Sequence, residues 1–86
     1  MNETEIRLRE IILKVARMDL TEEADKLFSD PDCDLMADFG LDSLLMVELV
    51  VEIESAFDIE FGLEDLDIEL LKKYGELVKY INENKD

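Results

Sequence analysis

Apolar residues recur at helical spacing in three stretches of the chain, at 5–18, 44–57 and from 71 or 72 to 82. In each stretch they gather on one face: Leu8, Ile11, Ile12 and Val15 in the first, Met46, Leu49, Val50, Ile53 and Phe57 in the second, and Tyr74, Leu77, Val78 and Ile81 in the third. In the first stretch, Arg7, Arg9, Glu10 and Lys14 lie outside that face. The pattern predicts three amphipathic helices, with a brief additional helix over 63–68.

The segments between these helices carry weaker signals. In the long connection from Asp19 to Phe39, Thr21 is a suitable start for a short helical turn, and Ser29-Asp30-Pro31-Asp32 reads as a turn. The inward anchors expected of this connection are Leu27, Phe28, Leu35, Met36 and Phe39. After the second helix, Asp58-Ile59-Glu60-Phe61 alternates like a short extended link. The expected fold is all-α: a small four-helix bundle with a long loop between the first two helices and a short third helix.

The second helix has a second apolar stripe, which its own folding does not require. Leu44, Val47 and Val51 fall nearly opposite the core face, beside Glu48. A surface helix needs one apolar face to pack on its domain, so a second face is best explained by a partner surface.

Ser43 stands at the expected start of this helix. Gly40 suits a tight turn, and Asp42 and Ser43 are both good N-cap residues. An exposed hydroxyl at a helix N-terminus is a favourable place for a phosphate, because the first N–H groups are unpaired and the helix dipole attracts negative charge. Taken alone, the same pair of residues far more often marks a simple helix cap.

The run Gly40-Leu41-Asp42-Ser43-Leu44, followed by Glu48-Leu49, resembles the attachment motif of the acyl and peptidyl carrier proteins. The resemblance extends over residues 35–40, 58–61 and 75–81, and it implies one carrier domain over 1–86. It implies that Ser43 carries a 4′-phosphopantetheine arm, transferred from coenzyme A by a phosphopantetheinyl transferase and holding acyl or aminoacyl cargo as a thioester. Asp42 would flank that site, and Leu44, Val47, Glu48 and Val51 would face partner enzymes with basic patches.

Three positions depart from the family pattern. Many fatty-acid carriers have an acidic and then a small polar residue after Ser-Leu, whereas Leu45 and Met46 follow here. Polyketide, peptidyl and other dedicated carriers therefore stay open beside fatty-acid synthesis. Relatives also have Thr or Ser at the start of the last helix, where this chain has Lys73.

Charge and composition narrow the classes of partner. The 86 residues include 24 acidic and 9 basic side chains, for a formal net charge of −15. Such a chain is poorly suited to nucleic acid or to an anionic membrane surface, and it favours partners with basic patches. We expect the protein in the cytoplasm, since the first residues lack the pattern of a signal peptide and no apolar run would span a membrane. A monomer is the expected state of a charged bundle this small.

The residue inventory argues against an enzyme. The chain has no histidine, so Ser43 lacks an ordinary general base, and its surroundings do not match the Gly-x-Ser-x-Gly elbow of hydrolases. The aspartates at 30, 32, 34 and 38 have partial calcium-loop spacing, but Leu35 and Leu41 stand where that loop needs glycine and glutamate. The single cysteine, Cys33, is assigned no role.

A second function class is compatible with the same residues. An acidic helical module could use the stripe of Leu44, Val47 and Val51 to bind a partner protein, with Ser43 serving only as a cap. This alternative predicts no covalent modification of the chain, whereas the carrier predicts one.

Overall fold

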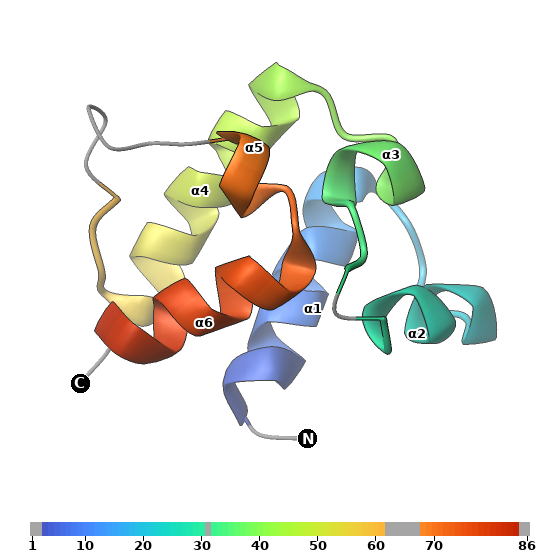
Figure 1. Ribbon diagram of the computed structural model, residues 1–86, viewed down its shortest axis with the longest axis horizontal. Coiled ribbons are helices and arrows are strands. Elements are labelled where there is room, and N and C mark those ends of the chain that lie inside the picture. The colour runs from blue at the N-terminus through green and yellow to red at the C-terminus, as the bar shows by residue number, and fades with distance from the viewer. Residues whose placement is uncertain (1–2, 31, 62–67, 85–86) are drawn as a thin grey trace.

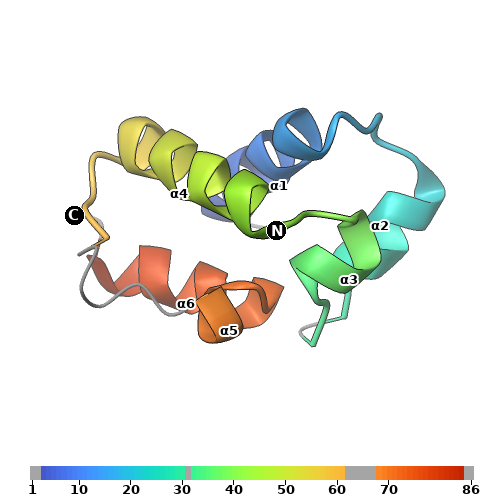
Figure 2. The ribbon, with the colours of Figure 1, turned by 90° about the horizontal axis from the view of Figure 1, so that it is seen from above.

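The computed structural model describes residues 3–30, 32–61 and 68–84. Its helices are α1 (Glu3–Ala16), α2 (Glu22–Phe28), α3 (Leu35–Phe39), α4 (Ser43–Phe57), α5 (Ile68–Leu71) and α6 (Tyr74–Asn84). Helices α1 and α4 lie side by side in one layer, α5 and α6 form the other, and α2 and α3 close one end (Figures 1 and 2). The predicted all-α fold is confirmed.

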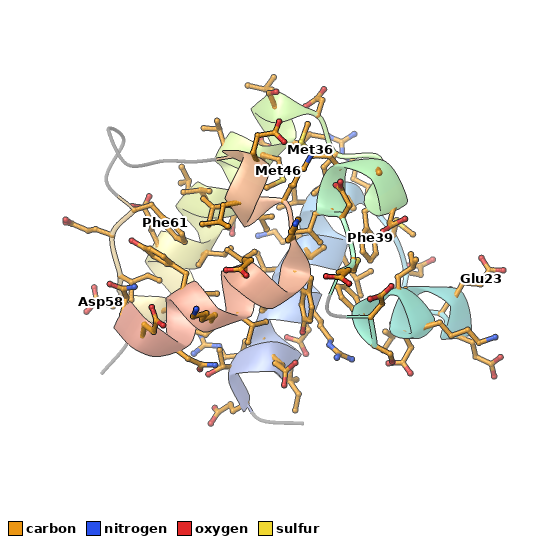
Figure 3. All side chains as sticks on the ribbon, in the orientation of Figure 1. Glu23, Met36, Phe39, Met46, Asp58 and Phe61 are labelled. Carbon is orange, nitrogen blue, oxygen red and sulfur yellow. The ribbon has the colours of Figure 1, made fainter. Side chains whose placement is uncertain are left out.

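One apolar core joins the two layers. The predicted core faces are confirmed, and four of their residues are half-buried at the edge of the core: Ile11, Val15, Phe57 and Val78. The largest fully buried side chains include Leu8, Ile12, Leu35, Met46, Leu49, Ile53, Leu77 and Ile81. In Figure 3, Met46 and Phe39 point into the bundle, whereas Glu23 projects from α2 into solvent.

The first helix begins and ends two residues earlier than predicted. It was expected over 5–18 and spans Glu3–Ala16, because Arg17 adopts a left-handed conformation with a φ of 57°. The Arg17 N–H donates to the Lys14 carbonyl (3.2 Å), and the Met18 N–H donates to the Leu13 carbonyl (2.9 Å). This pair of bonds is a Schellman motif, which closes a helix and turns the chain away.

The long connection contains two short helices. Thr21 caps α2, as predicted, by accepting a 3.1 Å hydrogen bond from the Ala24 N–H. Helix α3 was not predicted: Asp34 caps it by accepting from the N–H groups of Met36 (2.8 Å) and Ala37 (3.0 Å), and Gly40 ends it with a φ of 72°. An Asp and a Gly six residues apart are the cap signals that mark this helix in the sequence.

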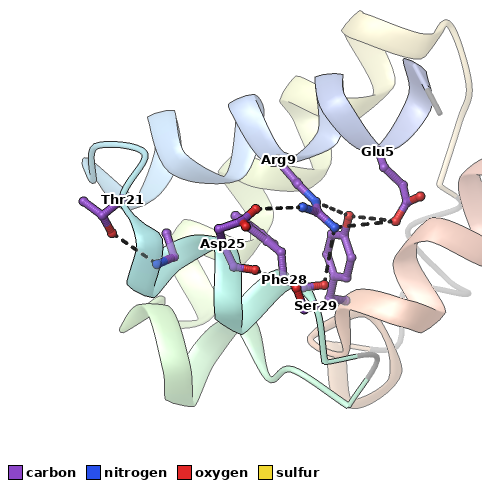
Figure 4. A network of polar contacts seen from close by, with 8 residues as sticks. Glu5, Arg9, Thr21, Asp25, Phe28 and Ser29 are labelled. Atoms are coloured by element: carbon purple, nitrogen blue, oxygen red, sulfur yellow. Dashed lines mark hydrogen bonds and ion pairs between the residues drawn. The ribbon is translucent and has the colours of Figure 1, made fainter. Parts of the chain in front are cut away.

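Arg9 ties the connection to the bundle (Figure 4). Its Nε donates to the Tyr74 hydroxyl (3.0 Å), and its other nitrogens reach Asp25 (3.4 Å) and the Phe28 carbonyl (3.5 Å). The guanidinium also lies over the rings of Phe28 and Tyr74, at 5.1 and 5.6 Å from their centroids. One side chain of α1 therefore holds α2 and α6 together.

The last helix starts later than predicted. Residues 71 and 72 were expected to open it, but Leu71 ends α5 and α6 begins at Tyr74. The Tyr74 N–H donates to the Cys33 carbonyl (2.9 Å), and the Leu35 N–H donates to the Lys72 carbonyl (2.6 Å). The Cys33 carbonyl thus satisfies the first N–H group of α6, which follows Lys73 rather than a Thr or Ser. The helix predicted over 63–68 falls almost entirely outside the described residues, as do Pro31 and Gly62.

The link after α4 alternates in burial, as predicted, but Asp58 is the left-handed cap of α4 (φ 54°) rather than part of an extended run. Ile59 and Phe61 are buried while Glu60 is exposed. The Phe61 N–H donates to the Glu54 carboxylate (2.9 Å), and its ring stacks on that of Tyr80 at 4.5 Å. The link is thereby fixed between α4 and α6.

Candidate functional site

Ser43 is the first residue of α4 and is exposed to solvent. The chain reaches it from the left-handed turn at Gly40 through Leu41, whose side chain is buried in the core. No atom lies within 4 Å of where a Gly40 side chain would begin, so it is the backbone conformation that favours glycine here. This turn and this anchor present the start of α4 at the surface.

Asp42, and not Ser43, caps the helix. Its Oδ1 accepts a 2.8 Å hydrogen bond from the Leu45 N–H, and its carbonyl accepts from the Met46 N–H at 2.9 Å. The sequence left both residues open as caps. The structure gives that role to the aspartate, so the cap does not occupy the Ser43 hydroxyl.

The first turn of α4 is suited to an anion. The N–H groups at the start of a helix have no partner within the helix, and they carry the positive end of its dipole. No acidic side chain stands in this first turn, where Leu44, Leu45 and Met46 follow the serine. A phosphodiester on the Ser43 hydroxyl would therefore lie at the positive end of the helix dipole, beside the Asp42 carboxylate.

The outer stripe of α4 is exposed, as the pattern predicts. The exposed fractions are 74% for Leu44, 42% for Val47 and 57% for Val51, against 1% for Met46. Glu48 is exposed beside them, so the stripe has a carboxylate at its edge. Leu45 is half-buried and Met46 is buried. These two departures from the family pattern, which follow Ser43-Leu44, therefore lie toward the core and not in this stripe.

Three aspartates that precede the site accept hydrogen bonds from backbone N–H groups. Asp34 caps α3, Asp38 Oδ2 accepts from the Asp34 N–H (2.9 Å), and Asp30 Oδ1 accepts from the Asp32 N–H (2.9 Å). The hydrogen bonds from the Ala37 and Met36 N–H groups and the nearby Lys72 ammonium lower the pKa of Asp34. In the part of the chain that the structure describes, no group of three or more metal-ligating side chains is placed to hold an ion.

Cys33 is a buried residue at the junction of α3 and α6. Burial, together with the carboxylates of Asp38, Asp30 and Asp34, raises the pKa of its thiol to about 12. Its carbonyl accepts the Tyr74 N–H. No local pattern indicates this packing role, because the contact joins segments about forty residues apart.

The chain belongs to the family of phosphopantetheine-bearing carrier proteins. The family model described as the phosphopantetheine attachment site matches residues 7–81, which includes most of α1 and the whole of α4. The prosthetic group of this family is 4′-phosphopantetheine, as the motif around Ser43 predicts.

Its relatives include acyl carrier proteins. The chain is 40% identical over 55 residues to the acyl carrier protein of Helicobacter pylori strain J99, and the aligned region covers 64% of this chain and 68% of that protein. It is 38% identical over 61 residues to the acyl carrier protein of Syntrophobacter fumaroxidans, which covers 71% of this chain and 73% of that protein. Within the described residues, no helix is both long and apolar enough to cross a bilayer.

Proposed function

We propose that Ser43 is the attachment residue and that the chain carries acyl or aminoacyl cargo for biosynthetic enzymes. The observation that carries the proposal is the division of roles at the start of α4: Asp42 caps the helix, and the neighbouring Ser43 hydroxyl is exposed. When bound, the phosphopantetheine arm supplies a terminal thiol that holds cargo as a thioester. The residues of the chain position that arm and bind partners, and they supply no catalytic group.

Recognition is assigned to the outer face of α4. Leu44, Val47 and Val51 form an apolar centre, with Asp42 and Glu48 as its acidic rim. Apolar contacts that lose water on docking provide most of the affinity, whereas exposed charges mainly set the association rate and the orientation. A small patch of this kind gives the transient binding that a monomeric carrier needs when it visits several enzymes.

The partners are a phosphopantetheinyl transferase and the loading and synthase enzymes of fatty-acid, polyketide or peptide biosynthesis in the cytoplasm. The net charge of −15 supports partners with basic patches, because opposite charges raise the encounter rate. The match over residues 7–81 supports treating 1–86 as one carrier domain.

The proposal is tested by intact mass measurement before and after incubation with a broad-specificity phosphopantetheinyl transferase, coenzyme A and Mg²⁺. One added arm that maps to Ser43 is expected. Ser43→Ala should fold and gain no mass, and Ser55→Ala, which alters another exposed serine of α4, should gain one arm. A folded wild-type chain that gains no mass would favour the interaction module, and an arm on Ser43→Ala would move the site elsewhere.

A further inference from the structure

A shallow hollow of about 190 Å³ lies between the C-terminal end of α1 and the middle of α4. Its lining residues are Lys14, Val15, Arg17, Glu48 and Glu52. The two helices run in opposite directions, so the end of α1 and the start of α4 lie at the same end of the molecule (Figure 1). Glu48 is five residues from Ser43, or about 7.5 Å along the helix axis. An enzyme that reaches Ser43 therefore also lies close to this hollow.

Arg17 occupies a position that usually belongs to glycine. It is the left-handed residue of the Schellman motif that ends α1, and a side chain with a Cβ atom is disfavoured in that conformation. The ends of α3 and α4 use Gly40 (φ 72°) and Asp58 (φ 54°), which are residue types that tolerate it better. An unfavourable residue at a special backbone position points to a role beyond folding.

The charges around the hollow are of both signs. Lys14 Nζ pairs with Glu52 Oε2 across the two helices at 3.3 Å. Arg17 and Glu48 are exposed, and the structure gives neither an ion pair with any residue that it describes. An exposed guanidinium and an exposed carboxylate thus stand beside the apolar stripe of α4.

We propose that this hollow extends the docking surface of α4 and is contacted by the phosphopantetheinyl transferase; the proposal rests on Ser43 being the attachment residue. A basic side chain of the transferase pairs with Glu48, and an acidic side chain beside it pairs with Arg17. A wholly acidic surface would attract any basic partner in several orientations. A cation at its edge repels a purely basic surface and fixes the register of a mixed one.

The test compares two substitutions that change the net charge equally. Arg17→Glu and Lys26→Glu each take the formal charge from −15 to −17, and Lys26 is an exposed residue of α2 outside the hollow. With a broad-specificity transferase, coenzyme A and Mg²⁺ at about 0.15 M salt, where long-range steering is screened, we expect Arg17→Glu to lower kcat/KM at least fivefold. Lys26→Glu should change it less than twofold.

A third variant separates docking from folding. Arg17→Gly removes the guanidinium and relieves the left-handed backbone, so it should be no less stable than the wild type while kcat/KM falls at least twofold. Equal rates for Arg17→Glu and Lys26→Glu, or a wild-type rate for Arg17→Gly, would overturn the docking role and leave the attachment site standing. Failure of the wild-type chain to gain an arm on Ser43 would overturn both proposals.

Discussion

The carboxylate of Asp42 accepts a 2.8 Å hydrogen bond from the backbone N–H of Leu45. The first residue of the helix after this cap is Ser43, whose side chain is exposed. Under the proposed function, the two adjacent residues have separate tasks: the aspartate caps the helix, and the serine carries the arm. The contribution of Asp42 to the first task is measured by the stability of its variants.

Loss of the Asp42 cap should destabilise the fold. Asp42→Ala leaves the Leu45 N–H without its acceptor, so we expect the free energy of unfolding to fall by about 1 kcal/mol. Asp42→Asn keeps a side-chain oxygen in place and should lose less than half as much. Urea unfolding followed by circular dichroism measures both. Equal losses for the two variants would show that the charge of Asp42 matters rather than its hydrogen bond.

The two faces of α4 should respond differently to truncation. Val47 is 42% exposed, so Val47→Ala should change the unfolding free energy by no more than about 0.5 kcal/mol. Leu49 is fully buried, and Leu49→Ala should cost about 2–5 kcal/mol through lost contacts and the cavity left behind.

A second variant, Val47→Arg, tests whether the outer stripe of α4 is recognised by partner enzymes. An arginine in the apolar centre of the outer stripe should slow arm transfer to Ser43 several-fold, because it places a charge where the partner excludes water. Circular dichroism should show unchanged helicity. Loss of helicity together with unchanged transfer would instead place Val47 among the residues that support the fold.

Helical periodicity predicted α1, α4 and α6 because one apolar face per helix is a local property of the sequence. The same rule identified the outer stripe, whose residues Leu44, Val47 and Val51 are exposed. The position of Ser43 followed from the local turn and cap residues around it. These features depend on neighbours within a few positions, so a single sequence contains them.

The junction of α5 and α6 depends on distant residues instead. Tyr74 starts α6 because its N–H meets the carbonyl of Cys33, and no pattern near residue 74 indicates that partner. Arg9 was placed on the polar face of α1, yet its side chain is only 14% exposed because segments from two other helices cover it. Contacts of this kind have no periodicity along the chain.

Arg9 should not be replaceable by lysine. Its planar fork reaches Tyr74, Asp25 and the Phe28 carbonyl at once and lies over two rings, whereas an ammonium can do only part of this. We expect Arg9→Lys to lower the free energy of unfolding by about 1–3 kcal/mol in urea. The matched control is Arg7→Lys, because Arg7 is exposed and lies over the Phe57 ring at 5.4 Å. It should cost no more than about 0.5 kcal/mol; equal losses would mean that Arg9 contributes through its charge alone.

Cys33 should be almost unreactive in the folded chain. Burial and the neighbouring carboxylates raise the pKa of its thiol from 9.0 to about 12, so near pH 8 the folded state holds roughly a thousand-fold less thiolate than an ordinary cysteine. Iodoacetamide followed by mass measurement should modify Cys33 quickly in denaturant and very slowly without it.

Because the unfolded thiol ionises first, its contribution to stability is fully present below about pH 9 and is lost as the pH rises toward 12. Cys33→Ala should remove that part of the alkaline loss of stability, and fast alkylation of the folded wild type would show that the thiol is open to solvent.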